Sequence, residues 1–78
     1  MIIGVNGRQY EILKGSDLQR DGAFVELNDV TDSEKKFLLE VFHTDSTGEE
    51  VFYTEKTEIP LQVLKAVMDA TNQWLKEK

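Results

Sequence analysis

The stretch PLQVLKAVMDATNQWLKEK, residues 60–78, carries the clearest structural signal in the chain. Placed at about 100° per residue, its apolar side chains form one arc of about 180° that only Thr71 interrupts. A surface helix needs a stripe of only about 100° to rest on its own core. We therefore expect a C-terminal helix that contacts two surfaces, a sheet beneath it and a partner beside it. The arc consists of Leu61, Val63, Leu64, Val67, Met68, Trp74 and Leu75.

Turn signals divide the rest of the chain into short apolar runs. Asn6-Gly7 supplies the two positive-φ positions of a type I′ hairpin turn, which places Ile3 opposite Tyr10. Residues 14–22 contain two glycines and no periodicity, so they are expected to form a loop. The helix is expected to begin at Pro60, because proline is favoured at the first helical position.

Three further strands are expected, over residues 23–28, 37–44 and 49–56, with a turn at residues 45–48 that ends in a left-handed glycine. The sequence therefore predicts an α+β fold in a single domain, residues 1–78. In that fold an antiparallel β-meander of four to five strands packs against one long C-terminal helix.

Strand alternation assigns the apolar side chains to two faces. One face, holding Val25, Leu27, Phe37, Leu39, Val41, Val51 and Tyr53, is expected to meet the helix through Leu61, Leu64, Met68 and Leu75. The opposite face would then carry Phe24, Leu38, Phe42 and Phe52, unless twist or a β-bulge folds some of them back into one core.

The size of the chain predicts self-association. A chain of 78 residues buries only about 60% of the surface of its unfolded form. With no cysteine and one histidine, a disulfide is impossible and a structural zinc site is disfavoured, which leaves a homodimer as the means of adding stability. The expected interface is either the helix edge or the second sheet face, with Trp74 as the strongest anchor. The candidate interface residues are Val63, Val67, Ala70 and Trp74, or Phe24, Phe42 and Phe52.

Charge narrows the range of partners. The net charge is −6, and residues 26–58 alone hold ten acidic and three basic residues. Such a field repels phosphate backbones and favours a basic protein partner, although it also fits a simple role in solubility. No apolar run reaches the roughly 18 residues of a membrane span, and the first residues lack the features of a signal peptide. We therefore expect a cytoplasmic protein.

No residue pattern predicts catalysis, a cofactor or a metal site. His43, Asp45 and Ser46 are neighbours in sequence, whereas catalytic triads converge from different elements, so turn formation explains Asp45 and Ser46 better. Glu26 and Glu40 alternate with apolar residues, as solvated strand positions do. The chain is therefore not expected to be an enzyme.

One alternative function comes from another class of protein. Single-stranded nucleic-acid binders of the transcription-coactivator type also place a dimerising helix after a curved antiparallel sheet, whose aromatic residues stack on bases. Here Phe42, Phe52 and Tyr53 would supply the rings, but acidic residues surround them. The preferred expectation is a small acidic protein-interaction module.

Several short motifs lie between residues 20 and 68, among them Arg20-Asp21-Gly22, Glu40-Val41-Phe42, Thr47-Gly48-Glu49 and Ile59-Pro60-Leu61. Together they resemble a group of short bacterial proteins with no known activity. The resemblance implies a bacterial or phage origin and the meander-plus-helix fold, and it brings no functional residues.

Overall fold

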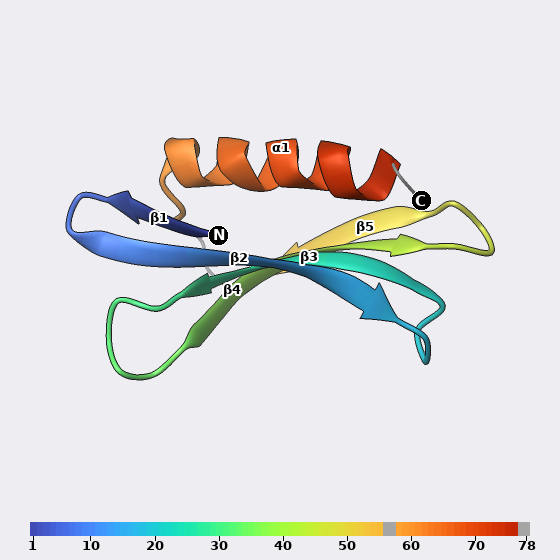
Figure 1. The fold of residues 1–78 in the computed structure, drawn as a ribbon, viewed down its shortest axis with the longest axis horizontal. Helices are drawn as coiled ribbons and strands as arrows, with labels where there is room; N and C mark the ends of the chain where they lie inside the picture. Colours follow the sequence, from blue (N-terminus) through green and yellow to red (C-terminus); the bar gives the residue numbers. More distant parts are fainter. Residues whose placement is uncertain (56–57, 77–78) are drawn as a thin grey trace.

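A computed structural model describes residues 1–55 and 58–76, with the side chain of residue 76 left out. Its five strands are β1 (Ile2–Val5), β2 (Arg8–Asp17), β3 (Gly22–Asp29), β4 (Lys36–Thr44) and β5 (Glu50–Thr54), and the helix α1 spans Leu61–Lys76. The strands form one antiparallel sheet in the order β1-β2-β3-β4-β5. Helix α1 lies along one face of this sheet (Figure 1). The predicted α+β meander with a C-terminal helix is confirmed.

The expected local signals produce the expected turns. Asn6 and Gly7 have φ angles of 52° and 79°, as a type I′ turn requires, and Ile3 pairs with Tyr10. Gly48 ends the β4–β5 turn with a φ of 74°. At the helix start, the carbonyl of Pro60 accepts a hydrogen bond from the backbone nitrogen of Leu64 at 3.1 Å. These positions depend on near neighbours in sequence, which is why they could be predicted.

The loop expected over residues 14–22 is wrong in its first part. Strand β2 continues to Asp17, and only residues 18–21 form the turn. Asp17 Oδ1 closes this turn by accepting hydrogen bonds from the backbone nitrogens of Gln19 and Arg20, at 3.1 and 3.2 Å. Gly15 lies within the strand opposite Phe24, and a Cβ at position 15 would be only 2.9 Å from the Phe24 ring. The glycine makes room for a cross-strand aromatic side chain rather than for a turn.

The hydrophobic core lies between α1 and the middle of the sheet. Val25 and Leu27 of β3 are fully buried, and Leu39 of β4 is 1% exposed. Each such side chain contributes roughly 1.5 to 3 kcal/mol relative to an exposed position. The helix contacts β3 most, followed by β1 and β2, so β5 lies beyond its cover. The core consists of Val5, Tyr10, Ile12, Val25, Leu27, Leu38, Leu39, Val63 and Val67.

The helix is rotated relative to the expectation. Val63 and Val67 are 0% and 1% exposed and face the sheet, whereas Leu61 and Met68, expected to point inward, are 63% and 58% exposed. Short branched side chains allow α1 to approach the sheet closely. Leu75 is buried as predicted. An apolar arc of about 180° offers several equally apolar sides, so the sequence alone could not select this orientation.

The face assignments hold for β3 and for part of β4, and they fail for β5. Phe24 and Phe42 are register partners on the face away from α1, as predicted. Phe52, however, pairs with Val41 and therefore lies on the helix side. Phe37, Val51 and Tyr53, expected beneath the helix, lie on the far face.

A β-bulge in β4 explains why Phe37 lies on the far face and Leu38 lies in the core. The register pairs Leu27 with Leu39 but Asn28 with Phe37, so Leu38 is the extra residue. Its side chain is 6% exposed and belongs to the core. The expectation that a bulge could return an apolar residue to the core is therefore correct for Leu38.

Of the expected strand 49–56, residue 56 lies outside the described residues.

Candidate functional site

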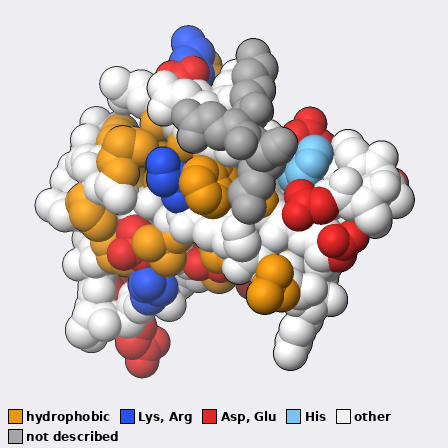
Figure 2. Space-filling model, turned by 45° about the vertical axis from the view of Figure 1, so that its right-hand side comes forward, with side chains coloured by type: hydrophobic (Ala, Val, Ile, Leu, Met, Phe, Trp, Pro, Cys, Tyr) orange, Lys and Arg blue, Asp and Glu red, His pale blue; other side chains and the backbone are white. Residues whose placement is uncertain are grey.

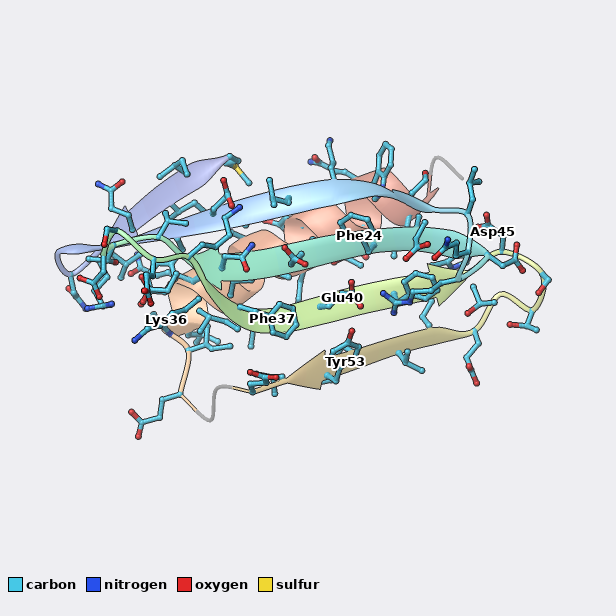
Figure 3. The ribbon with its side chains drawn as sticks, turned by 90° about the horizontal axis from the view of Figure 1, so that it is seen from below. Phe24, Lys36, Phe37, Glu40, Asp45 and Tyr53 are labelled. Atoms are coloured by element: carbon cyan, nitrogen blue, oxygen red, sulfur yellow. The ribbon has the colours of Figure 1, made fainter. Side chains whose placement is uncertain are left out.

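Strand β5 is the most exposed regular element of the described chain. All five of its residues are exposed, including Val51 at 46%, Phe52 at 66% and Tyr53 at 49%. Figure 3 shows β5 at one edge of the sheet, on the outer side of β4. Natural edge strands are usually protected by charge, by short length or by a covering element. An uncovered edge with three large apolar side chains is therefore the first candidate for a binding surface.

The backbone of β5 uses alternate residues to pair with β4. Thr44 donates from its backbone nitrogen to the Glu49 carbonyl at 2.9 Å, and Glu55 donates to the Leu38 carbonyl at 3.0 Å. In an antiparallel ladder the residues between such pairs direct their N–H and C=O groups to the other side. The backbone groups of Glu50 and Phe52 therefore point outward from the sheet.

An apolar groove runs beside this edge on the helix side. Its volume is about 320 Å³. Leu39 and Val41 of β4 and Phe52 of β5 contribute from the sheet, and Leu64 and Met68 contribute from α1. The groove exists because α1 covers the other half of the sheet. We use the name β5 edge surface for Val51, Phe52 and Tyr53 together with Leu64 and Met68.

Acidic side chains occupy both ends of β5. Glu49 and Glu50 precede the apolar residues, and Glu55 and Glu58 follow them; all four are exposed. At the β4–β5 turn, His43 Nδ1 lies 3.3 Å from Glu50 Oε2, and Figure 2 shows the histidine among acidic side chains. The β5 edge surface is thus an apolar stretch between two negative ends.

Asp45 and Ser46 lie in the β4–β5 turn, where they were expected. Their backbone nitrogens donate to the Asp21 carbonyl at 2.7 Å and to Asp21 Oδ2 at 3.2 Å. These bonds connect the β4–β5 turn with the β2–β3 turn. His43 Nε2 lies 3.9 Å from Asp45 Oδ1, at the limit of an ion pair.

On the far face, a buried carboxylate connects β5 with β4. Arg20 Nη2 donates to Glu40 Oε1 at 2.9 Å and Nη1 donates to Oε2 at 3.2 Å, while the Tyr53 hydroxyl donates to Glu40 Oε1 at 2.6 Å. Glu40 is only 5% exposed. The hydrogen bond to Glu40, together with burial, raises the pKa of Tyr53. Figure 3 shows Glu40 and Tyr53 on this face, with Phe24 and Phe37 nearby.

These contacts give the far face a structural role. The Arg20 guanidinium lies 3.8 Å from the centre of the Phe42 ring, and Phe42 is 4% exposed. Glu26, the register partner of Glu40, accepts a hydrogen bond from Asn28 Nδ2 at 2.9 Å. Each of the two carboxylates therefore has its own polar partner, and the Phe42 ring is covered.

The residues expected to form an interface are mostly buried within one chain. Val63, Val67 and Phe42 belong to the buried residues, and Ala70, Trp74 and Phe24 are half-buried. Trp74 Nε1 donates to the Gly15 carbonyl at 3.3 Å. Of the seven candidates only Phe52 is exposed.

Sequence reasoning misplaced four apolar residues at this side of the molecule. It put Val51 and Tyr53 beneath the helix and pointed Leu61 and Met68 inward, whereas all four are exposed. The available signal was the pattern Glu49-Glu50-Val51-Phe52-Tyr53-Thr54-Glu55, because acidic residues on both sides of a short apolar run are typical of an edge strand.

Comparison with protein-family models, curated proteins and solved structures found no match. Within residues 1–55 and 58–76, no group of three or more His, Cys, Asp or Glu side chains could hold a metal ion. Among the described residues, no helix is both long and apolar enough to cross a membrane.

Proposed function

We propose that this protein is a small acidic protein-interaction module that binds its partner through the β5 edge surface. One observation carries the proposal: a complete edge strand with outward-pointing backbone groups lies beside an apolar groove, and α1 covers neither. Strand addition to such an edge is a common mode of recognition, since backbone hydrogen bonds supply affinity and side-chain pockets supply specificity.

The homodimer predicted from chain length is an alternative occupant of the same surface. Val63 and Val67 already pack on the sheet of their own chain, so the helix edge that they were expected to form has no free apolar surface at these positions. A symmetric dimer would instead use the β5 edge surface. Sedimentation at micromolar concentration measures whether the chain forms that dimer.

Single-strand nucleic-acid binding is the alternative from another class. The far face does hold Phe24, Phe37 and Tyr53, but Glu40 lies at its centre and the Phe42 ring is covered. Titration with labelled oligonucleotides tests this alternative, because affinity for a phosphate backbone falls steeply as salt is raised. Binding at low salt would favour it over the interaction module.

A site-specific photo-crosslink tests the preferred function. We would replace Phe52 by benzoylphenylalanine in the full chain, expressed in a bacterial cytoplasm. Ile2 provides a matched control, because it is 53% exposed on β1, at the opposite edge of the same sheet. A protein adduct at position 52 and none at position 2 is the expected result. Equal adducts at both positions, or none at either, would contradict the proposal.

A further inference from the structure

We propose that the partner of the β5 edge surface is an extended segment with three or four apolar residues and Lys or Arg at both of its ends, added to the sheet as a sixth strand. The inference rests on the proposed function and defines the chemistry of the partner. Three features of β5 carry it: its backbone, its two apolar sides and its charged ends.

The backbone determines that the partner is extended. Glu50 and Phe52 direct their N–H and C=O groups away from β4, because Glu49 and Glu55 belong to the set that pairs with it. A helix has no unused backbone groups along its length to meet them. A strand satisfies them with its own ladder of hydrogen bonds.

The side chains determine that the middle of the partner is apolar on both faces. Phe52 points to the helix side, beside the groove with Leu64 and Met68. Val51 and Tyr53 point to the far face, where Tyr53 lies 6.0 Å from the Phe37 ring. Since successive residues of an added strand alternate between these faces, each finds an apolar neighbour.

The ends of β5 determine the charge of the partner. The segment from Asp45 to Glu58 holds five acidic residues and one lysine, and Glu49, Glu55 and Glu58 form no ion pair with another described residue. These carboxylates lie on both sides of the apolar stretch. Lysine or arginine at both ends of the added strand would therefore be attracted at two points.

The same charges disfavour a second copy of this chain as the occupant. Antiparallel pairing of β5 with itself, centred on Phe52, places Glu50 opposite Thr54 of the copy and brings Glu49 close to its Glu55. Like charges directly opposite each other destabilise a strand pair. Acidic residues at both ends of β5 thus act against self-pairing and in favour of a basic partner.

Two fluorescein-labelled peptides test the inference by anisotropy with the full chain. The first, KRVYVTKR, has the proposed pattern, and the second, EEVYVTEE, differs only in the charge of its ends. We expect the basic peptide to bind at least about tenfold more tightly, and its affinity to fall on the order of tenfold between 0.05 and 0.5 M NaCl. Equal affinity for the two peptides, or no binding of either, would overturn the inference.

Matched variants separate the backbone contribution from the side-chain contribution. The Phe52→Ala variant keeps the outward N–H group, whereas Phe52→Pro removes it without removing a bond to β4. Binding should be weakened by the first and abolished by the second. A charge-reversed chain, Glu49→Lys with Glu55→Lys, should prefer the acidic peptide and provides a test that does not depend on proline. Circular dichroism checks the fold of each variant, and an unchanged peptide preference in the folded charge-reversed chain would overturn the inference.

Sedimentation separates failure of this inference from failure of the proposed function. If neither peptide binds but the wild type forms a dimer that Phe52→Pro abolishes, the occupant is a second copy. The basic partner is then overturned and the interaction module stands. If neither peptide binds, the wild type is a monomer and position 52 gives no photo-adduct, both proposals are overturned.

Discussion

The half of the sheet beneath α1 and the half beyond it differ sharply in exposure. Val25 and Leu27 of β3 are fully buried, whereas Val51, Phe52 and Tyr53 of β5 are 46% to 66% exposed. A helix is about 10 Å wide and strands are spaced about 4.8 Å apart, so one helix covers two or three strands. A five-stranded sheet with one helix therefore has a stable half and an uncovered half. The first maintains the fold and the second is available for a partner.

The largest expected effect on stability comes from a substitution in the half of the sheet that α1 covers. We expect Leu27→Ala to lower the free energy of unfolding by about 3 kcal/mol, because it creates a cavity at a fully buried position. In a small domain this is a large share of the total stability. Urea unfolding followed by circular dichroism measures the loss. A loss below about 1 kcal/mol would show that this half of the sheet is not the core.

The next effect on stability concerns the ion pair between Arg20 and Glu40, which joins the β2–β3 turn to β4. Arg20→Met removes the bidentate partner of the buried Glu40 carboxylate and should cost about 2 kcal/mol. Adding Glu40→Gln in the same chain should recover part of the loss, because no uncompensated charge remains. A double-mutant cycle in urea measures this coupling. Purely additive effects would show that the pair does not act as a unit.

A third, smaller effect depends on pH. Burial alone would raise the pKa of Asp29, but hydrogen bonds from Thr31 and Arg8 outweigh it and lower the pKa to about 2. Because the unfolded chain binds this proton at higher pH, the contribution of Asp29 is present above about pH 4 and is lost as the pH falls towards 2. Asp29→Asn should therefore lower stability at pH 7 by on the order of 1 kcal/mol, discounted because Arg8 is half exposed.

The comparison that tests this pH effect is the difference between the wild type and Asp29→Asn. Urea midpoints from pH 7 to pH 2.5 should converge as the pH falls, since the wild type alone loses this contribution. A constant difference across the range would contradict the assignment.

The smallest effect on stability is expected at the uncovered edge. Phe52→Ala should change the free energy of unfolding by less than about 0.5 kcal/mol, because two thirds of the side chain is already exposed. The same variant should weaken peptide binding, which Leu27→Ala should affect only through the fraction of folded chain. Urea unfolding and peptide anisotropy on both variants measure the two effects. A stability loss at Phe52 equal to that at Leu27 would remove the distinction between the halves.

Local sequence determined the order of elements and most of the turns. Asn6-Gly7 and Gly48 adopt left-handed backbone conformations that favour these residue types, and Pro60 marks the start of α1. The strand pattern between these points was sufficient to predict an antiparallel meander with a C-terminal helix. Each of these features depends on residues within a few positions of one another, so no knowledge of the folded chain is needed.

Tertiary structure alone decided which side chains are available at the candidate site. The apolar arc of α1 is wide enough for several rotations, and the close packing of Val63 and Val67 on the sheet selected the one that exposes Leu61 and Met68. The bulge returned Leu38 to the core, and the β4–β5 register placed Phe52 opposite Val41 on the helix side and Tyr53 opposite Glu40 on the far side. A one-residue shift of register moves every later side chain to the other face. The location of the binding surface was therefore set by contacts between residues far apart in the sequence, which the pattern of the chain does not contain.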